Sequence, residues 1–167
     1  MKKISATLVS KLHSLSDLPP LIFRLILAYG FYGPAIEKVR HFESTVRWFQ
    51  DGLQLPFPVV NAVMATSTEC LGVVLVLLGL ATRIISVPMM VIMLVAIKTV
   101  HWPDGFAACE SVKSADGVIE RVKHGFEIPF YYFWMLFSLL VTGPGRISLD
   151  YLIGQKINAT SLRQSVR

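Results

Sequence analysis

Length, composition and charge place this chain among membrane proteins. Its 167 residues are 53% hydrophobic and only 16% charged, which is unlike an ordinary water-soluble domain. The formal net charge of +5 does not indicate nucleic-acid binding, because the basic residues lie at the tails and loop ends without forming a run. The composition therefore predicts the lipid bilayer as a partner and no nucleic acid.

Residues 1–18 precede the first long apolar segment and are expected to form a cytoplasmic amphipathic segment. Four of its apolar residues fall near one helical face, as in a short interfacial helix; they are Ile4, Leu8, Leu12 and Leu15. The segment lacks the compact apolar core of a cleavable signal, so the apolar segment that follows is interpreted as an uncleaved anchor.

Four apolar segments are candidates for membrane crossing, which takes about 20 helical residues. They are expected at residues 19–38, 57–80, 84–100 and 128–142, with Ser16 and Asp17 as capping candidates for the first. The turn at residues 81–83 is so short that the second and third helices must be antiparallel neighbours. A soluble protein of this size has too little polar structure to cover four apolar helices. The predicted fold is all-α: a polytopic membrane protein, a single domain over residues 1–167, folded as an antiparallel four-transmembrane-helix bundle.

The distribution of Lys and Arg predicts the orientation of the bundle. The N-terminal segment, the turn near Arg83 and the tail of residues 146–167 are basic with few acids, whereas the two longer connections mix both signs. Both termini and the tail are therefore expected in the cytoplasm, with the longer connections outside. The predicted location is a bacterial inner membrane.

Two ionisable residues fall deep inside the expected spans. Arg24 and Glu69 each carry a charge that costs about 2.5–3.5 kcal/mol to insert unless it is paired or neutralised. Helical geometry puts them about 9 Å apart in depth, which an arginine side chain spans. Glu69 shares a helical face with small residues, so we expect it to point into the bundle. Two interpretations stay open: a packing residue neutralised by a proton or by Arg24, or a proton- or substrate-handling carboxylate. Glu69 and Arg24 are thus the catalytic candidates.

A second polar cluster is expected near the outer surface, where helices one, three and four begin or end. Its members are Glu37, Lys38, Lys98, His101, Trp102 and Glu127. One interpretation is a set of solvated helix ends with snorkelling lysines. The other is a binding pocket, roofed by the loop after Trp102, for a lipid headgroup, a quinone ring or a partner peptide. A metal site at His101 with two of the glutamates is the weaker alternative, and no metal is predicted.

Three further charged residues, Arg83, Arg146 and Asp150, are expected to cap the cytoplasmic ends of the bundle as interface anchors and ion pairs. The two cysteines, Cys70 and Cys109, form neither a CxxC pair nor a zinc-ligand spacing, so we expect two unpaired thiols.

Four short stretches of the chain resemble the DoxX family. They are Arg24 with Gly33 and Lys38; Glu69 with Gly72, Gly79, Leu80 and Arg83; residues 100–103 (VHWP) with Gly105 and Phe106; and residues 143–150 (GPGRISLD). Residues 29–34 (YGFYGP) and 126–129 (FEIP) further resemble the HvfX-like branch, which accompanies copper-associated modified-peptide systems. The resemblance implies a bacterial inner-membrane four-helix bundle linked to redox biology. The longer outer loop of residues 107–124, with Cys109, departs from that branch.

Two functional hypotheses follow. The first is a membrane subunit that supports a redox- or metal-linked process within a larger complex or homo-oligomer, with a quinone as the candidate cofactor. In the enzymatic version it is an accessory subunit of an oxidoreductase. The second is a non-catalytic scaffold or chaperone that presents its outer loops to a peptide or protein during maturation.

Overall fold

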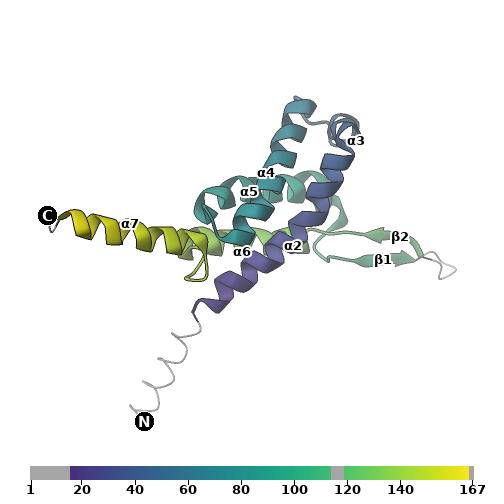
Figure 1. The fold of residues 1–167 in the computed structure, drawn as a ribbon. Helices are drawn as coiled ribbons and strands as arrows, with labels where there is room; N and C mark the ends of the chain where they lie inside the picture. The colour runs from purple at the N-terminus through teal and green to yellow at the C-terminus, as the bar shows by residue number, and fades with distance from the viewer. Residues whose placement is uncertain (1–15, 114–118, 166–167) are drawn as a thin grey trace, which may run out of the picture.

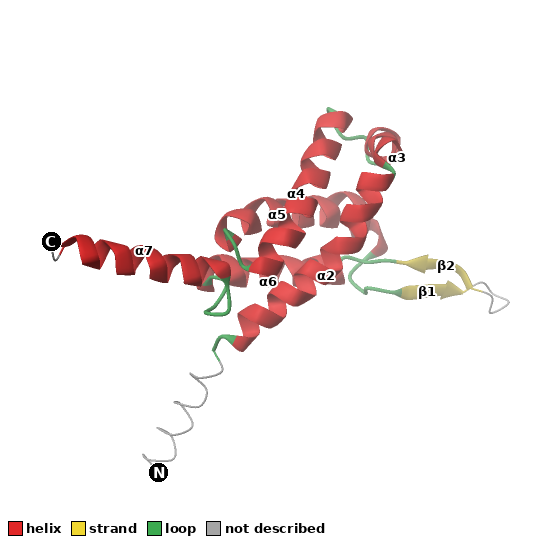
Figure 2. Cartoon of the chain, viewed as in Figure 1, coloured by secondary structure: helices red, strands yellow, loops and turns green. Residues whose placement is uncertain are grey.

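Helices make up most of the chain (Figures 1 and 2). The computed structural model describes residues 16–113 and 119–165, so the amphipathic segment expected at residues 1–18 falls mostly outside the described residues. The helices, in chain order, are α2 (Leu18–Arg40), α3 (Phe42–Arg47), α4 (Pro58–Leu78), α5 (Thr82–Ala96), α6 (Glu127–Thr142) and α7 (Leu149–Ser165). A π-helical turn, Trp48–Gly52, follows α3, and α5 continues through Ile97–His101 and Trp102–Asp104. The four apolar segments expected from the sequence fall on α2, α4, α5 and α6.

The turn between α4 and α5 has a clear local cause. Gly79 ends α4 with a φ of +66°, a left-handed conformation that costs glycine least. The amides of Gly79 and Leu80 donate to the carbonyls of Val76 and Leu75 at 3.1 and 2.9 Å, the bonding pattern of a Schellman motif. The chain reverses at once and α5 packs beside α4, which confirms that the second and third helices are neighbours.

The core lies among α2, α4, α5 and α6. α4 packs against α2 and α5, and α6 packs against α5 and α2. The apolar residues at the centre are Leu27, Phe31, Val76, Ile85, Met89, Met93, Leu136 and Leu139. We call the end where α2 begins, α6 ends and α7 begins the terminal end, and the end that carries α3 and the loop after α5 the loop end.

Two stretches are long and apolar enough to cross a membrane, Pro58–Leu78 and Thr82–Asp104. Within their most apolar windows only 28% and 22% of the residues are buried. The core helix of a soluble protein would be mostly buried, and monomeric soluble proteins rarely expose large contiguous apolar surface. α6 is also apolar but spans only 16 residues. Lipid is therefore the medium that the outer faces of α4 and α5 fit.

A β-hairpin lies in the loop that was expected to be irregular. Strands β1 (Glu110–Lys113) and β2 (Ile119–Lys123) pair antiparallel, with a register shift between Val112 and Lys113. The hairpin projects away from the helices (Figure 1). The all-helical fold class is confirmed for the body of the chain, and the hairpin is a local exception, in which alternating charged and β-branched residues suit a two-stranded ribbon.

The terminal end is held together by side chains that reach backbone atoms. Asp17 occupies the N-cap position of α2, as expected, but its carboxylate makes no capping hydrogen bond to that helix. It accepts a hydrogen bond from the amide of Arg146 at 2.9 Å instead. The start of α2 is thereby tied to the segment that links α6 and α7.

Candidate functional site

An interhelical cavity of about 300 Å³ lies toward the loop end. Residues of all four core helices and of the turns after α3 and α5 line this cavity. Its polar lining residues are Lys38, Trp48, Glu69, His101 and Tyr132, and the apolar wall includes Phe31, Ile92, Met93, Val100 and Ile128. A small number of polar groups converging in an apolar wall is typical of ligand sites.

The charged centre of this cavity is an ion pair between Lys38 and Glu69. Lys38 Nζ lies 2.8 and 3.0 Å from the two carboxylate oxygens of Glu69. The side chains are 18% and 4% exposed, so the pair is largely withdrawn from solvent. Lys38 sits two residues before the end of α2, and its side chain turns inward instead of snorkelling to the surface. Glu69 therefore faces a cation and a cavity together.

The expected pairing of Glu69 with Arg24 is wrong. Arg24 lies at the terminal end, where its guanidinium donates to four backbone carbonyls. The acceptors are Val76 O at 2.8 Å, Leu77 O at 2.6 Å, Ile147 O at 2.5 Å and Pro144 O at 3.3 Å. The last turn of α4 leaves carbonyls without partners in the helix, and a planar guanidinium with five donors satisfies several of them at once. The hydrogen bonds of Arg24 therefore join α2, α4 and the segment after α6, and we call this contact the Arg24 junction.

His101 and Tyr132 add further polar groups to the cavity. Nδ1 of His101 lies 2.6 Å from the carbonyl oxygen of His124. Because a carbonyl only accepts, Nδ1 is the donor in this contact. Tyr132 packs closely over Gly30: a Cβ at Gly30 would lie 2.1 Å from the phenol oxygen. Gly30 is thus required for this approach of α6 to α2.

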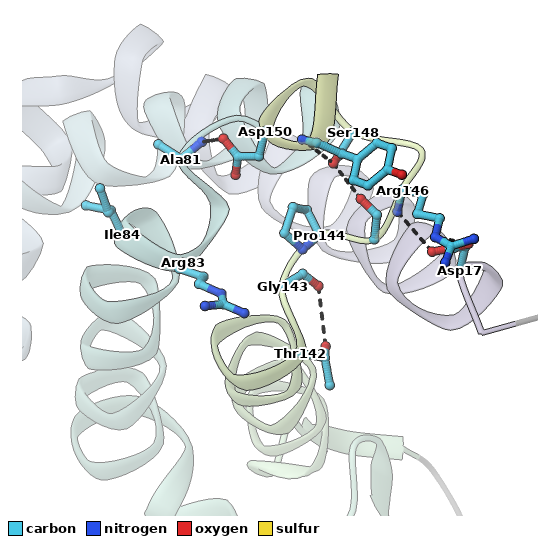
Figure 3. Close-up of a pocket in the computed structure, with 12 residues that line it drawn as sticks. Asp17, Ala81, Arg83, Ile84, Thr142, Gly143, Pro144, Arg146, Ser148 and Asp150 are labelled. Carbon is cyan, nitrogen blue, oxygen red and sulfur yellow. Dashed lines mark hydrogen bonds and ion pairs between the residues drawn. The ribbon is translucent and has the colours of Figure 1, made fainter. Parts of the chain in front are cut away.

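A second, shallower pocket of about 660 Å³ lies at the terminal end (Figure 3). It is formed by the start of α5, the end of α6 and the segment of residues 143–148. Asp150 accepts hydrogen bonds from the amides of Ala81 and Thr82 at 2.8 and 3.1 Å and so caps α5 from a distant part of the chain. Arg83 and Arg146 both line this pocket.

Comparisons with known proteins find a family match for part of this chain. A model described as DoxX matches residues 20–102. The chain contains a DoxX domain. A protein of Haemophilus influenzae (strain ATCC 51907 / DSM 11121 / KW20 / Rd), named "Uncharacterized protein", is 27% identical over 140 residues, covering 80% of this chain and 82% of its own length. No solved structure matches.

This DoxX match supports the resemblance at the level of the family. It includes Arg24 of the junction and four of the five polar residues of the cavity, namely Lys38, Trp48, Glu69 and His101. The match ends at Trp102, so α6 and the segment of residues 143–150 lie beyond it. The match shows a DoxX domain over residues 20–102, and the assignment of the chain to the HvfX-like branch stays a prediction.

The structure places only some members of the expected outer cluster in the cavity. Lys38 and His101 line the cavity, whereas Glu37 is exposed and lies 3.5 Å from His41 one helical turn away. Lys98 is exposed. Trp102 is 65% exposed and stacks on Phe126 with ring centroids 5.5 Å apart.

Glu127 has partners of its own outside the cavity. Its carboxylate accepts hydrogen bonds from the Ala108 amide at 2.9 Å and the Tyr131 hydroxyl at 2.8 Å. These two bonds, the amide first, hold the pKa of Glu127 below its usual value. Glu127 therefore fastens the loop after α5 to the start of α6. Within the part of the chain that the structure describes, no group of three or more His, Cys, Asp or Glu residues is placed to hold a metal.

Sequence reasoning missed Trp48 and Tyr132. Trp48 belongs to a connection that was expected to be a loop, and its apolar pattern with Phe42 and Phe49 was the available signal for the short helix α3. Tyr132 lies in an aromatic stretch of the fourth apolar segment, a composition typical of a membrane interface, and only the packing of α6 on α2 shows that it lines the cavity.

Proposed function

We propose that this DoxX family protein is a quinone-binding subunit of a bacterial inner membrane that supports a redox process together with protein partners. In this proposal α2, α4, α5 and α6 all cross the bilayer, with both termini in the cytoplasm. Lys and Arg at the terminal end support the orientation. The cavity near the loop end would then open toward the outer side.

The Lys38–Glu69 pair beside an apolar wall is the observation that carries the proposal. A quinone ring presents two carbonyl acceptors on a flat apolar body, and it needs donors at its oxygens and apolar contact on its faces. Lys38 and the Tyr132 hydroxyl are donors, and Phe31, Met93 and Ile128 form apolar wall. A volume of about 300 Å³ is at the lower end for ligand sites, which suits the ring with its tail outside in lipid.

The ion pair also suits a ligand whose protonation changes with its redox state. Glu69 is enclosed with one cation, Lys38, at hydrogen-bond distance. If the ammonium group of Lys38 moves toward a ligand oxygen, the negative charge of Glu69 loses its partner. Protonation of Glu69 removes that unpaired charge. Quinone reduction consumes protons as well as electrons, and the electrons would come from a redox centre held by a partner subunit.

Binding is tested by tryptophan fluorescence, because quinones quench nearby indole emission and Trp48 lines the cavity. The reporter is the full chain with Trp102→Phe and Trp134→Phe, purified in mild detergent and titrated with a short-tailed ubiquinone analogue. We expect saturable quenching that an alkylbenzene of similar size does not produce.

The matched variants are Lys38→Met and Lys98→Met, since both lysines lie toward the loop end but only Lys38 lines the cavity. We expect Lys38→Met to weaken quinone binding about tenfold, the loss of one charge-assisted hydrogen bond, and Lys98→Met to leave it unchanged. Quenching that does not saturate, or that is equal in both variants, would refute the quinone proposal.

The hairpin supports a second candidate function, a scaffold for a peptide or protein partner. β1 and β2 form a two-stranded sheet, so each strand has one backbone edge that the other does not pair. Such edges accept an extended peptide as an additional strand. Replacing residues 110–123 by a short Gly/Ser linker, which leaves Ala108 and His124 in place, should abolish co-purification of a partner while preserving the unfolding temperature. Unchanged co-purification would rule out the hairpin as the binding surface.

A further inference from the structure

The pocket at the terminal end has the composition of a site for a charged and partly apolar ligand. Arg83 and Arg146 face it together with the segment of residues 143–148 (Figure 3). Ile84, which also lines the pocket, is 76% exposed, and Val141 and Ile147 beside it are 60% and 56% exposed. Charged donors and uncovered apolar side chains therefore meet at one place on a membrane protein.

Charge at this end is unevenly distributed among the arginines. Asp150 has both carboxylate oxygens on the amides that begin α5, and Arg24 lies close enough to interact with it electrostatically. Asp17 accepts a hydrogen bond from the Arg146 amide and lies 3.8 Å from Arg146 Nε. Arg24 lies near Asp150 and Arg146 lies near Asp17. Of the three arginines Arg24, Arg83 and Arg146, Arg83 is therefore the one whose positive charge neither aspartate balances.

The guanidinium of Arg83 is only partly used. Within the described part of the chain its hydrogen-bond acceptor is Val141 O, at 3.3 Å from Nη2, which is a long bond. The head group extends over Gly143 toward the pocket (Figure 3), and a Cβ at Gly143 would lie 3.3 Å from Nη2. The missing side chain keeps the approach to the guanidinium open.

We propose that this pocket binds the phosphate headgroup of an anionic phospholipid, with Arg83 as its principal ligand. Planar guanidinium groups bind phosphate oxygens in pairs, and basic pockets at the ends of membrane helices suit anionic headgroups. The volume of about 660 Å³ is far larger than a free phosphate ion needs. Ile84 and Val141 supply the apolar surface along which the acyl chains run.

The test is a lipid titration of the delipidated full chain in mild detergent, read by native mass spectrometry. The probes are dioleoyl phosphatidylglycerol, phosphatidylethanolamine and phosphatidylcholine, with inorganic phosphate as a competitor. We expect preferential binding of phosphatidylglycerol, which inorganic phosphate at millimolar concentration does not displace. Equal binding of the three lipids, a preference for phosphatidylethanolamine or displacement by phosphate would overturn the proposal.

Variants locate the site on the chain. Arg83→Gln should weaken phosphatidylglycerol binding about five- to tenfold, since one basic contact at the membrane surface is lost, and Arg83→Lys should recover part of the loss. Arg47→Gln, an exposed arginine at the loop end, is the matched control and should bind as the wild type does. Arg83 is itself exposed, so Arg83→Gln should keep the wild-type unfolding temperature. Wild-type affinity in Arg83→Gln, or an equal loss in Arg47→Gln, would refute the assignment.

Asp17→Asn separates an anionic from a zwitterionic ligand. The substitution releases Arg146 from its ion pair, so phosphatidylglycerol should bind at least as tightly as before. Weaker binding would mean that the aspartate itself contacts the ligand, which would contradict the proposal.

Discussion

The two buried cations of the DoxX domain, Arg24 and Lys38, occupy opposite ends of α2 and are satisfied in different ways. Arg24 is 3% exposed and donates to four backbone carbonyls, acceptors that do not titrate and cannot move without unwinding a helix end. Lys38 binds the carboxylate of Glu69, a group that does titrate, beside a cavity. The first arrangement can only hold the fold together, whereas the second is able to respond to a ligand or a proton.

The Arg24 junction should show the largest loss of stability. Arg24→Gln removes a charge and most of its donors, so the carbonyls of Leu77 and Ile147 lose their guanidinium donor, whereas Val76 O keeps the Gly79 amide. Each carbonyl that finds no other donor costs about 1–3 kcal/mol. We expect a large drop in unfolding temperature in detergent, measured by circular dichroism.

Arg24→Lys is the informative control for that prediction. Lysine keeps the charge but has no planar fork to reach four carbonyls, so it should recover only a minor part of the lost stability. Full recovery would show that charge, not the pattern of donors, matters at this junction.

The Lys38–Glu69 pair should depend on both partners, unlike the Arg24 junction. Lys38→Met leaves an uncompensated carboxylate and should cost about 2–4 kcal/mol, whereas the double variant Lys38→Met with Glu69→Gln should return to within about 1 kcal/mol of the wild type. The measurement is the free energy of unfolding in a double-mutant cycle. Additive losses would mean that the pair is not an energetic unit.

The double variant also separates stability from binding. It should remain folded and still fail to bind the quinone analogue, because the donor at Lys38 and the charge at Glu69 are both gone. Binding of the analogue at wild-type affinity would confine the pair to a structural role.

The sequence predicted the two regions to different extents. The helices around Gly79 and the inward position of Glu69 follow from apolar length, a glycine stop and a small-residue face, which are local properties. The partner of Glu69 does not follow from them. Depth along an ideal helix favoured Arg24, but the Lys38 side chain turns inward and reaches Glu69. Side-chain direction is decided by packing, which no spacing rule contains.

Local sequence patterns also fail to predict which residues come together at the cavity and at the terminal end. Tyr132 and Trp48 enter the cavity because α6 packs on α2 and α3 folds over the loop end, both of which are tertiary events. The Asp17–Arg146 contact joins residues 129 positions apart, so the local sequence around either residue does not predict it. The β-hairpin was missed because a short charged ribbon has a weaker pattern than an apolar helix.

The cavity wall offers a smaller and more local test. Gly30→Ala would place a methyl group 2.1 Å from the Tyr132 hydroxyl oxygen, so Tyr132 or α6 must shift. Overpacking of this kind costs about 1–3 kcal/mol, and quinone affinity should fall with it. Gly33→Ala, three residues along α2, meets nothing within 4 Å and should be neutral or stabilising by up to about 1 kcal/mol. Equal effects of the two alanines on unfolding would show that α6 does not approach α2 at Gly30.

The smallest expected effect is a pH response at Glu127, outside both buried sites. Its pKa is lowered from the ordinary value of 4.5 by the Ala108 amide and the Tyr131 hydroxyl, so these bonds favour the folded loop above that pH and are lost as the pH falls through the lowered pKa. We expect the fluorescence of Trp102, which stacks on Phe126 beside Glu127, to change in acid in a variant that retains only this tryptophan. Glu127→Gln in that background should remove the transition, because an amide does not titrate there, while Glu37→Gln, an exposed glutamate, should leave it in place. A transition that persists in Glu127→Gln would assign the acid response to another group and would separate the loop after α5 from the charge that begins α6.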